Sequence, residues 1–342
     1  MRLSLLDRSR TRRGCSEAAA LWHSVERAVR AEKLGYRRFW AAEHHAVPGV
    51  ASGSPAVLLA AAGAATQEIR LGSGGVMLPH HQPLVVAEQF LMLAGLHPGR
   101  IDLGLGRSLG FTEPVRRALR QQSAEEDEYA ADLAELGAYL HGTAEVTAQP
   151  VVRPEDRPVM HVLATGKGIG LAAQLGLPVV LGGPVLRSAE LPEMLRTYRR
   201  DFRPAGEGVA GPEVIVSADV YPASSRREAR SAALPEAWAM ARSRETGVFA
   251  ALEPVERIQD AQWSSRTSER VEQSLNTSIL GTPLEVSDQI ERLMKATGAG
   301  EFMISTSTYD LEELGVLDAE VSRIMLGRGD GGAPEAAASG AP

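Results

Sequence analysis

Short apolar runs that end abruptly in polar residues recur along the first third of the chain. The run at 36–42 ends in Glu-His-His at 43–45, and a loop rich in Pro, Gly and Ser follows it. The run at 69–78 is followed by Pro-His-His, and the run at 100–106 is followed by Arg-Ser. Buried parallel strands have this continuous apolar character. We therefore interpret these runs as strands whose carboxyl ends open into a site.

Segments with helical periodicity separate the runs. A helix is expected from Ser16 to the stop at Gly35, and Pro55 and Pro83 occupy the favoured first position of two more helices. Strands are expected at 2–6, 36–43, 69–78, 100–106, 158–163, 178–181, 214–220 and 301–305. Later helices are expected after a capping box at 123–126 and at 168–175, 191–198, 283–296 and 311–325.

Alternating strands and helices of this kind predict an α/β fold, and polar residues at strand carboxyl ends are typical of a (β/α)8 TIM barrel. We expect one domain over 1–326, with an irregular excursion at 223–279 between the seventh and eighth strands. That excursion is either a lid over a substrate pocket or an outer helical layer. Residues 327–342, mostly Gly, Ala and Pro, are predicted to be a disordered tail.

Composition narrows the class without identifying it. The chain has 342 residues, 44% hydrophobic and 23% charged, with 36 basic and 43 acidic residues and a net charge of -7. This balance argues against a nucleic-acid surface. The longest apolar run is too short to span a bilayer, and Cys15 is the only cysteine. We expect a cytoplasmic protein without an intrachain disulfide and without a membrane partner.

Four motifs in the first third carry a family resemblance. They are WAAEHH at 40–45, RLGSGGVMLP at 70–79, PLVVAEQ at 83–89 and PGRIDLGLGR at 98–107. Weaker matches occur at 171–178 and 281–283. In this order and spacing they resemble the bacterial-luciferase-like flavin monooxygenases, over about two thirds of the chain.

The resemblance implies a TIM barrel, usually dimeric, that binds reduced FMN supplied by a separate flavin reductase. It further implies that the protein activates dioxygen to hydroxylate or epoxidise a small organic substrate. By analogy with the family, this reaction would belong to specialised metabolism. Two alternatives stay open: a deazaflavin-dependent oxidoreductase, and a non-catalytic partner subunit of a luciferase-like heterodimer. The substrate itself cannot be deduced from the sequence, because pocket specificity resides in the unassigned loops.

His44 and Glu43 are the catalytic candidates. An imidazole titrates near neutral pH and can manage protons during oxygen activation, whereas the alternative is a structural hydrogen-bonding role. Adjacent strand residues point to opposite faces, so His44 and His45 should not act together. No metal site is expected, because barrel hydrolases use His-x-His and that spacing is absent. His80 and His81 are expected to shape the rim.

The phosphate of the cofactor has two candidate sites. The family resemblance assigns it to Arg107, and a guanidinium can hold phosphate through two parallel hydrogen bonds. Arg107 follows Gly104-Leu-Gly106, where the missing side chains let a flat cofactor approach the backbone, so Gly106 is a candidate cofactor-binding residue. A dinucleotide motif fails here because Leu109 occupies the third glycine position. The turn at 165–168 precedes a helix and suits a phosphate. Relatives carry several hydroxyl residues there, while this chain has only Thr165, with Lys167 as a replacement cation.

Gly74 and Gly75 lie in the middle of the third predicted strand, where glycine weakens packing. Luciferase-like proteins carry a non-prolyl cis peptide at the corresponding place, beside the flavin. We predict a bulge or a cis bond here, facing the barrel mouth near His44 and Arg107. A simple bulge with no nearby ligand is the alternative.

Overall fold

The computed structural model describes residues 1–110, 112–123, 125–164, 166, 168–204 and 211–327. Eight parallel strands close into a barrel, in the order β1, β2, β3, β4, β5, β6, β7 and β10 around the ring. The barrel strands are β1 (Arg2–Asp7), β2 (Arg38–Ala41), β3 (Arg70–Met77), β4 (Ile101–Gly106), β5 (Val159–Ala164), β6 (Val179–Gly182), β7 (Val214–Ala218) and β10 (Glu301–Ile304). The predicted (β/α)8 barrel is confirmed.

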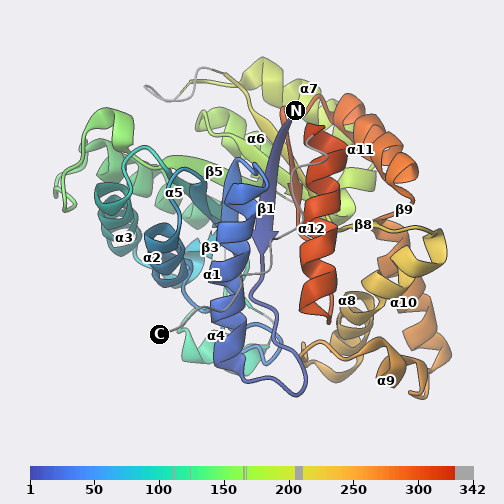
Figure 1. Ribbon diagram of the computed structural model, residues 1–342. Helices are drawn as coiled ribbons and strands as arrows, with labels where there is room; N and C mark the ends of the chain where they lie inside the picture. Colours follow the sequence, from blue (N-terminus) through green and yellow to red (C-terminus); the bar gives the residue numbers. More distant parts are fainter. Residues whose placement is uncertain (111, 124, 165, 167, 205–210, 328–342) are drawn as a thin grey trace, which may run out of the picture.

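Helices cover the outside of this ring, as Figure 1 shows for α1 and α12 in front of β1. The helices outside the excursion are α1 (Glu17–Lys33), α2 (Pro55–Ala65), α3 (Pro83–Leu96), α4 (Glu113–Ala118), α5 (Glu126–His141), α6 (Gly168–Gln174), α7 (Leu191–Asp201), α11 (Pro283–Thr297) and α12 (Leu311–Leu326). Local signals explain several starts. Ser16 caps α1 by accepting a hydrogen bond from the Ala19 amide, and Thr282 forms a capping box with Glu285 on α11.

Trp40 fills the interior of the barrel. It is fully buried in a cluster with Val180, Ile215 and Met303, separate from the larger core between strands and helices. A Cβ atom at Gly72 would lie 2.8 Å from the indole ring. The glycines of β3 therefore leave space for a large aromatic side chain that would otherwise clash.

The amino-terminal ends of the strands are closed by buried ion pairs. Arg38 on β2 contacts Asp102 on β4 at 2.9 Å and also pairs with Glu301 on β10. Arg70 on β3 contacts the same Asp102 at 2.7 Å. Asp102 and Glu301 are both fully buried. Four strands are thus connected at the end of the barrel opposite the predicted site, where residues serve stability.

Two sequence predictions need correction. The seventh strand was expected to run from 214 to 220, but it ends at Ala218, and a separate strand β8 (Val220–Pro222) pairs in parallel with β9 (Ile279–Gly281) outside the barrel. The capping box expected at 123–126 is wrong, because α5 begins at Glu126 with Glu125 as its cap and no side-chain cap bond.

The excursion is mainly helical, with α8 (Arg226–Thr246), α9 (Val255–Gln259) and α10 (Ser265–Thr277). These helices gather at the end of the molecule toward which the β1 arrow points (Figure 1). They share their own apolar cluster with Tyr221 and Leu280 of the β8–β9 pair. The ring centroids of Trp238 and Trp263 lie 5.2 Å apart in a tilted arrangement. Trp238 is buried in this cluster, and the half-buried Trp263 packs against it.

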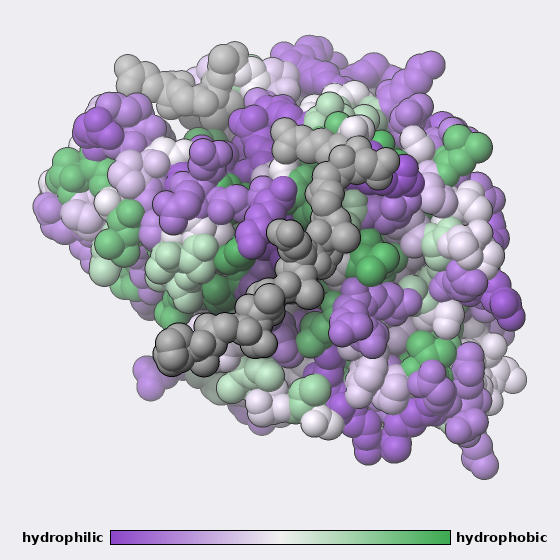
Figure 2. Space-filling view, in the orientation of Figure 1, coloured by the Kyte–Doolittle hydropathy of each residue, from purple (hydrophilic) through white to green (hydrophobic). Residues whose placement is uncertain are grey.

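The molecular surface is mostly hydrophilic on the face drawn in Figure 2, with hydrophobic residues in small separate groups. Among the helices that the structure describes, none has the length and apolar content needed to cross a membrane. The predicted tail at 327–342 lies outside the described residues, apart from Gly327, which caps α12.

Candidate active site

A cavity of about 1080 Å³ opens at the carboxyl end of the barrel. Trp40, His44 and Gly74 line it from the β2 and β3 side, and Ala164 lines it from the end of β5. Small-molecule sites commonly measure about 300–1,000 Å³. This cavity therefore has room for a cofactor together with a small substrate, at the barrel end where catalytic residues are expected.

His44 is half-buried at the cavity wall, while the side chain of His45 turns the other way to Glu43. The two neighbouring imidazoles thus have separate environments, although both follow the end of β2 at Ala41 and do not lie within the strand. Burial, with the positive charges of Arg8 and Arg10, lowers the pKa of His44 to about 4. His44 is accordingly a neutral base at pH 7, able to accept a proton in the cavity.

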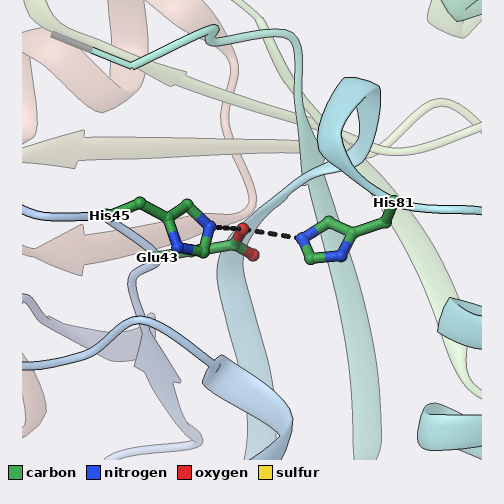
Figure 3. Close-up of side chains that lie close together, drawn as sticks. All are labelled: Glu43, His45 and His81. Atoms are coloured by element: carbon green, nitrogen blue, oxygen red, sulfur yellow. Dashed lines mark hydrogen bonds and ion pairs between the residues drawn. The ribbon is translucent and has the colours of Figure 1, made fainter. Parts of the chain in front are cut away.

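Glu43 lies behind the cavity wall, between two imidazoles (Figure 3). Its Oε1 atom is 2.7 Å from Nε2 of His45 and 2.7 Å from Nε2 of His81. Its Oε2 atom accepts a hydrogen bond from the amide of Met77 at 3.2 Å. Glu43 therefore joins the segment after β2 to the end of β3.

The charge of Glu43 follows from these contacts. Burial alone would raise its pKa, but hydrogen bonds from His45 and His81 outweigh burial and lower the pKa to about 2. Glu43 is thus a carboxylate at neutral pH and can only accept hydrogen bonds. Both imidazoles consequently donate their Nε2 protons to it.

The same three side chains are of types that bind metal ions, with ligand atoms within 4.8 Å of one another. The sequence prediction considered only His-x-His spacing. It therefore did not identify Glu43 and His45, which lie two residues apart and share a face. With Zn–N distances of about 2.0 Å, tetrahedral ligand atoms lie about 3.3 Å apart. The 2.7 Å separations here are those of hydrogen bonds.

Gly74–Gly75 is a cis peptide, and the pairing of β3 with β4 shifts register between Gly74 and Val76. The prediction of a bulge or cis bond is confirmed. Gly74 lines the cavity with His44, and a Cβ atom on it would lie 3.3 Å from Cβ of Trp40. A Cβ on Gly75 would lie 2.8 Å from the carbonyl oxygen of Gly104. A side chain at either position would clash, at Gly74 with Leu6 and at Gly75 with the backbone of β4.

Of the residues predicted to bind the cofactor phosphate, the structure describes Arg107 but not Thr165 or Lys167. Arg107 is 40% exposed, lies outside the residues lining the cavity, and contacts Glu126 at 3.7 Å. Gly106 precedes it at the end of β4. Thr165 and Lys167 lie outside the described residues. Ala164, the last residue of β5, lines the cavity.

The sequence did not predict a cluster of ion pairs that lies at the cavity. Arg8, directly after β1, contacts Asp219 and Glu236 at 3.0 Å each. Glu236 on α8 also contacts Arg10 at 2.8 Å. Arg8 follows a strand end just as the Glu-His-His triplet does, so the same strand-end signal could have identified it. Its partners lie far along the chain, Asp219 between β7 and β8 and Glu236 on α8 of the excursion, and no local pattern indicates that pairing.

The lowered pKa of His44 predicts acid sensitivity. Because the folded pKa of about 4 lies below the ordinary 6.5, the folded state binds fewer protons between these values, and stability falls as pH falls. Between pH 6.5 and pH 4 the parent should lose free energy of unfolding, and we expect His44→Gln to reduce this loss by about 1–3 kcal/mol. Urea unfolding at several pH values measures this.

The matched control is His141→Gln, at an exposed position on α5, which should follow the parent curve. The contribution of Glu43 belongs to a lower window, because its pKa falls from 4.5 to about 2 and its stabilising effect is lost only below pH 4.5. Parallel curves for the parent and His44→Gln between pH 6.5 and 4 would contradict the prediction.

Sequence comparison identifies the family to which this barrel belongs. The family model for luciferase-like monooxygenase matches residues 1–301. A protein of Escherichia coli K12 named luciferase-like monooxygenase is 36% identical over 315 residues, covering 90% of this chain and 92% of that protein. The chain belongs to the luciferase-like monooxygenase family and is an oxidoreductase.

Solved structures agree with this assignment. The crystal structure of apo-MsnO8 is 30% identical, with a TM-score of 0.84, and the alignment covers 95% of this chain and 98% of that one. The oxygenating constituent of 3,6-diketocamphane monooxygenase of Pseudomonas putida, solved in complex with FMN, gives a TM-score of 0.70. It is 18% identical, with 94% of this chain and 97% of that one covered, and shows the shared fold.

Proposed function

We propose that the protein is a flavin-dependent monooxygenase that uses reduced FMN and dioxygen to hydroxylate or epoxidise a small organic substrate. The observation that carries this is the barrel-mouth cavity, where His44, Trp40 and Gly74 meet. A neutral imidazole, a buried aromatic wall and a glycine surface suit a planar ring held out of water. In this proposal a separate reductase supplies the reduced flavin, and the protein is a homodimer.

The residues present fit such a ring. Gly74 lines the cavity together with Trp40 and has no side chain of its own, so a flat group can approach the β3 backbone there. The phosphate would extend toward the turn after Ala164, with Thr165, Lys167 and Arg107 as its candidate partners. When bound, reduced FMN supplies the two electrons that activate dioxygen.

The protein's own groups manage protons and water. His44 is neutral at pH 7 and can take a proton from the substrate and return it, with Glu43 fixing the strand end that carries it. Leu6, Leu163 and Val180 present apolar side chains to the cavity and exclude water.

The test is oxygen uptake by the purified protein with FMN, NADH and a flavin reductase, screened over a panel of small organic compounds. Substrate-dependent uptake and a product heavier by one oxygen atom support the proposal. Hydride transfer to a deazaflavin without oxygen uptake would identify the deazaflavin-dependent alternative. Binding of neither cofactor would indicate a non-catalytic partner subunit.

Arg107→Ala tests the phosphate role. We expect FMN binding to weaken by about 2 kcal/mol, the scale of a lost charge-assisted contact, while riboflavin, which has no phosphate, binds parent and variant alike. Fluorescence titration with both ligands measures the difference. Arg117→Ala, an exposed position on α4, is the control. Equal weakening of both ligands would assign Arg107 to support of the rim.

A further inference from the structure

Three arginines of the outer helices face the same cavity as His44. Arg244 comes from α8, Arg270 from α10 and Arg292 from α11. Within the described part of the chain, none of the three forms an ion pair or a hydrogen bond. Elsewhere on α8, by contrast, Arg230 holds Glu272 at 2.6 Å. The excursion and α11 thus bring uncompensated positive charge to the cavity.

The cavity's carboxylates do not neutralise this charge. Among the described residues that line the cavity, the acidic ones are Asp219 and Glu236. Arg8 contacts both at 3.0 Å, and Arg10 contacts Glu236 at 2.8 Å. These two carboxylates are therefore already paired, and the outer wall keeps its positive excess.

Arg270 is the most informative of the three. Its Nη1 atom is buried and has no hydrogen-bond partner in the described structure. A buried charged donor without an acceptor costs free energy. A guanidinium matches a carboxylate by two parallel hydrogen bonds. Gln273 and Ser274, one helical turn along α10, add neutral polar groups beside it.

The inner part of the cavity has the opposite character. Leu6, Trp40, Val180 and Met303 line it, and the last three belong to the apolar cluster inside the barrel. A ligand that satisfies both parts has an apolar body and one anionic end. We propose that the substrate is an organic carboxylic acid, with its body against Trp40 and His44 and its carboxylate on Arg270. Arg244 and Arg292 add attraction at the entrance. This assignment rests on the proposed monooxygenase function.

Paired acids and amides test the charge directly. The probes are hexanoate, 4-phenylbutanoate and decanoate, each compared with its primary amide, which has nearly the same shape and no charge. Calorimetric titration of the full-length protein should show at least one acid binding about 10-fold or more tightly than its amide. Arg270→Gln should abolish this preference and leave amide binding unchanged.

Arg266→Gln is the matched control, since it removes the same charge from an exposed position on α10 outside the cavity lining. It should keep the acid preference. Arg292→Gln is a second variant, expected to reduce the preference partly. Thermal unfolding of each variant checks that it is folded.

Three results would overturn the proposal. The first is equal binding of every acid and its amide, and the second is an equal loss of preference in Arg266→Gln. The third is weaker binding of FMN, but not of riboflavin, to Arg270→Gln, which would assign Arg270 to the cofactor phosphate. Acid preference in a protein that binds no flavin would support the anion site while refuting the monooxygenase proposal, so the two failures are distinguishable.

Discussion

His44→Ala is expected to lower substrate-dependent turnover by about 100-fold or more, the usual scale for a general acid-base group. FMN affinity should change little, because His44 meets the cavity from the end of β2, whereas the predicted phosphate partners follow β4 and β5. Steady-state oxygen uptake gives turnover, and fluorescence titration gives FMN affinity.

His45→Gln provides the comparison at the neighbouring position. His45 contacts Glu43 and lies outside the cavity lining, so its replacement should cost less turnover than loss of His44. Imidazole added to His44→Ala should restore part of the activity if proton transfer is the missing step. Turnover equal to that of the parent in His44→Ala would make His44 a structural residue.

Asp102→Ala is expected to lower the free energy of unfolding by about 3–5 kcal/mol, because it leaves buried charges without their partner. Asp102 is fully buried, and it holds Arg38 at 2.9 Å and Arg70 at 2.7 Å. Removing it separates the ends of β2, β3 and β4. Urea unfolding followed by circular dichroism measures the change.

The control for Asp102 is Asp201→Ala. Asp201 pairs with its neighbour Arg200 at the exposed end of α7, and surface pairs of this kind contribute little to stability. Its unfolding midpoint should match that of the parent. If Asp102→Ala unfolded at the same urea concentration as Asp201→Ala, the strand-end network would have no measurable role in holding the barrel closed.

The features predicted correctly from sequence are those with a local cause. Apolar runs ending in polar residues identified the barrel strands and the rim that carries His44. Two consecutive glycines in β3 predicted the irregular backbone at Gly74–Gly75, because glycine in a strand interior often marks a bulge or a close approach to the backbone. The cap residue Ser16 located the start of α1, since a capping side chain bonds to amides only a few positions away.

The features that sequence reasoning missed depend on contacts between distant segments. His81 reaches Glu43 from the turn after β3, and Glu236 reaches Arg8 from α8. The break after Ala218 exists because Val220 pairs with Ile279, far along the chain. Three aromatic residues of the excursion could line a lid, and of these Phe249 lines the barrel-mouth cavity whereas Trp238 and Trp263 do not. Their spacing along the chain contains no information about which side they pack against.

The short parallel pair β8–β9 has an evolutionary consequence. It holds the start and the end of the excursion side by side, from Val220 beside Ile279 to Pro222 beside Gly281. A segment with clamped ends can be lengthened, shortened or exchanged without moving the strands on either side. Descendants of this fold could therefore inherit the rim that carries His44 unchanged and acquire a new outer wall in a single recombination event. Chimeras joined at these two strands would be the laboratory counterpart of that route.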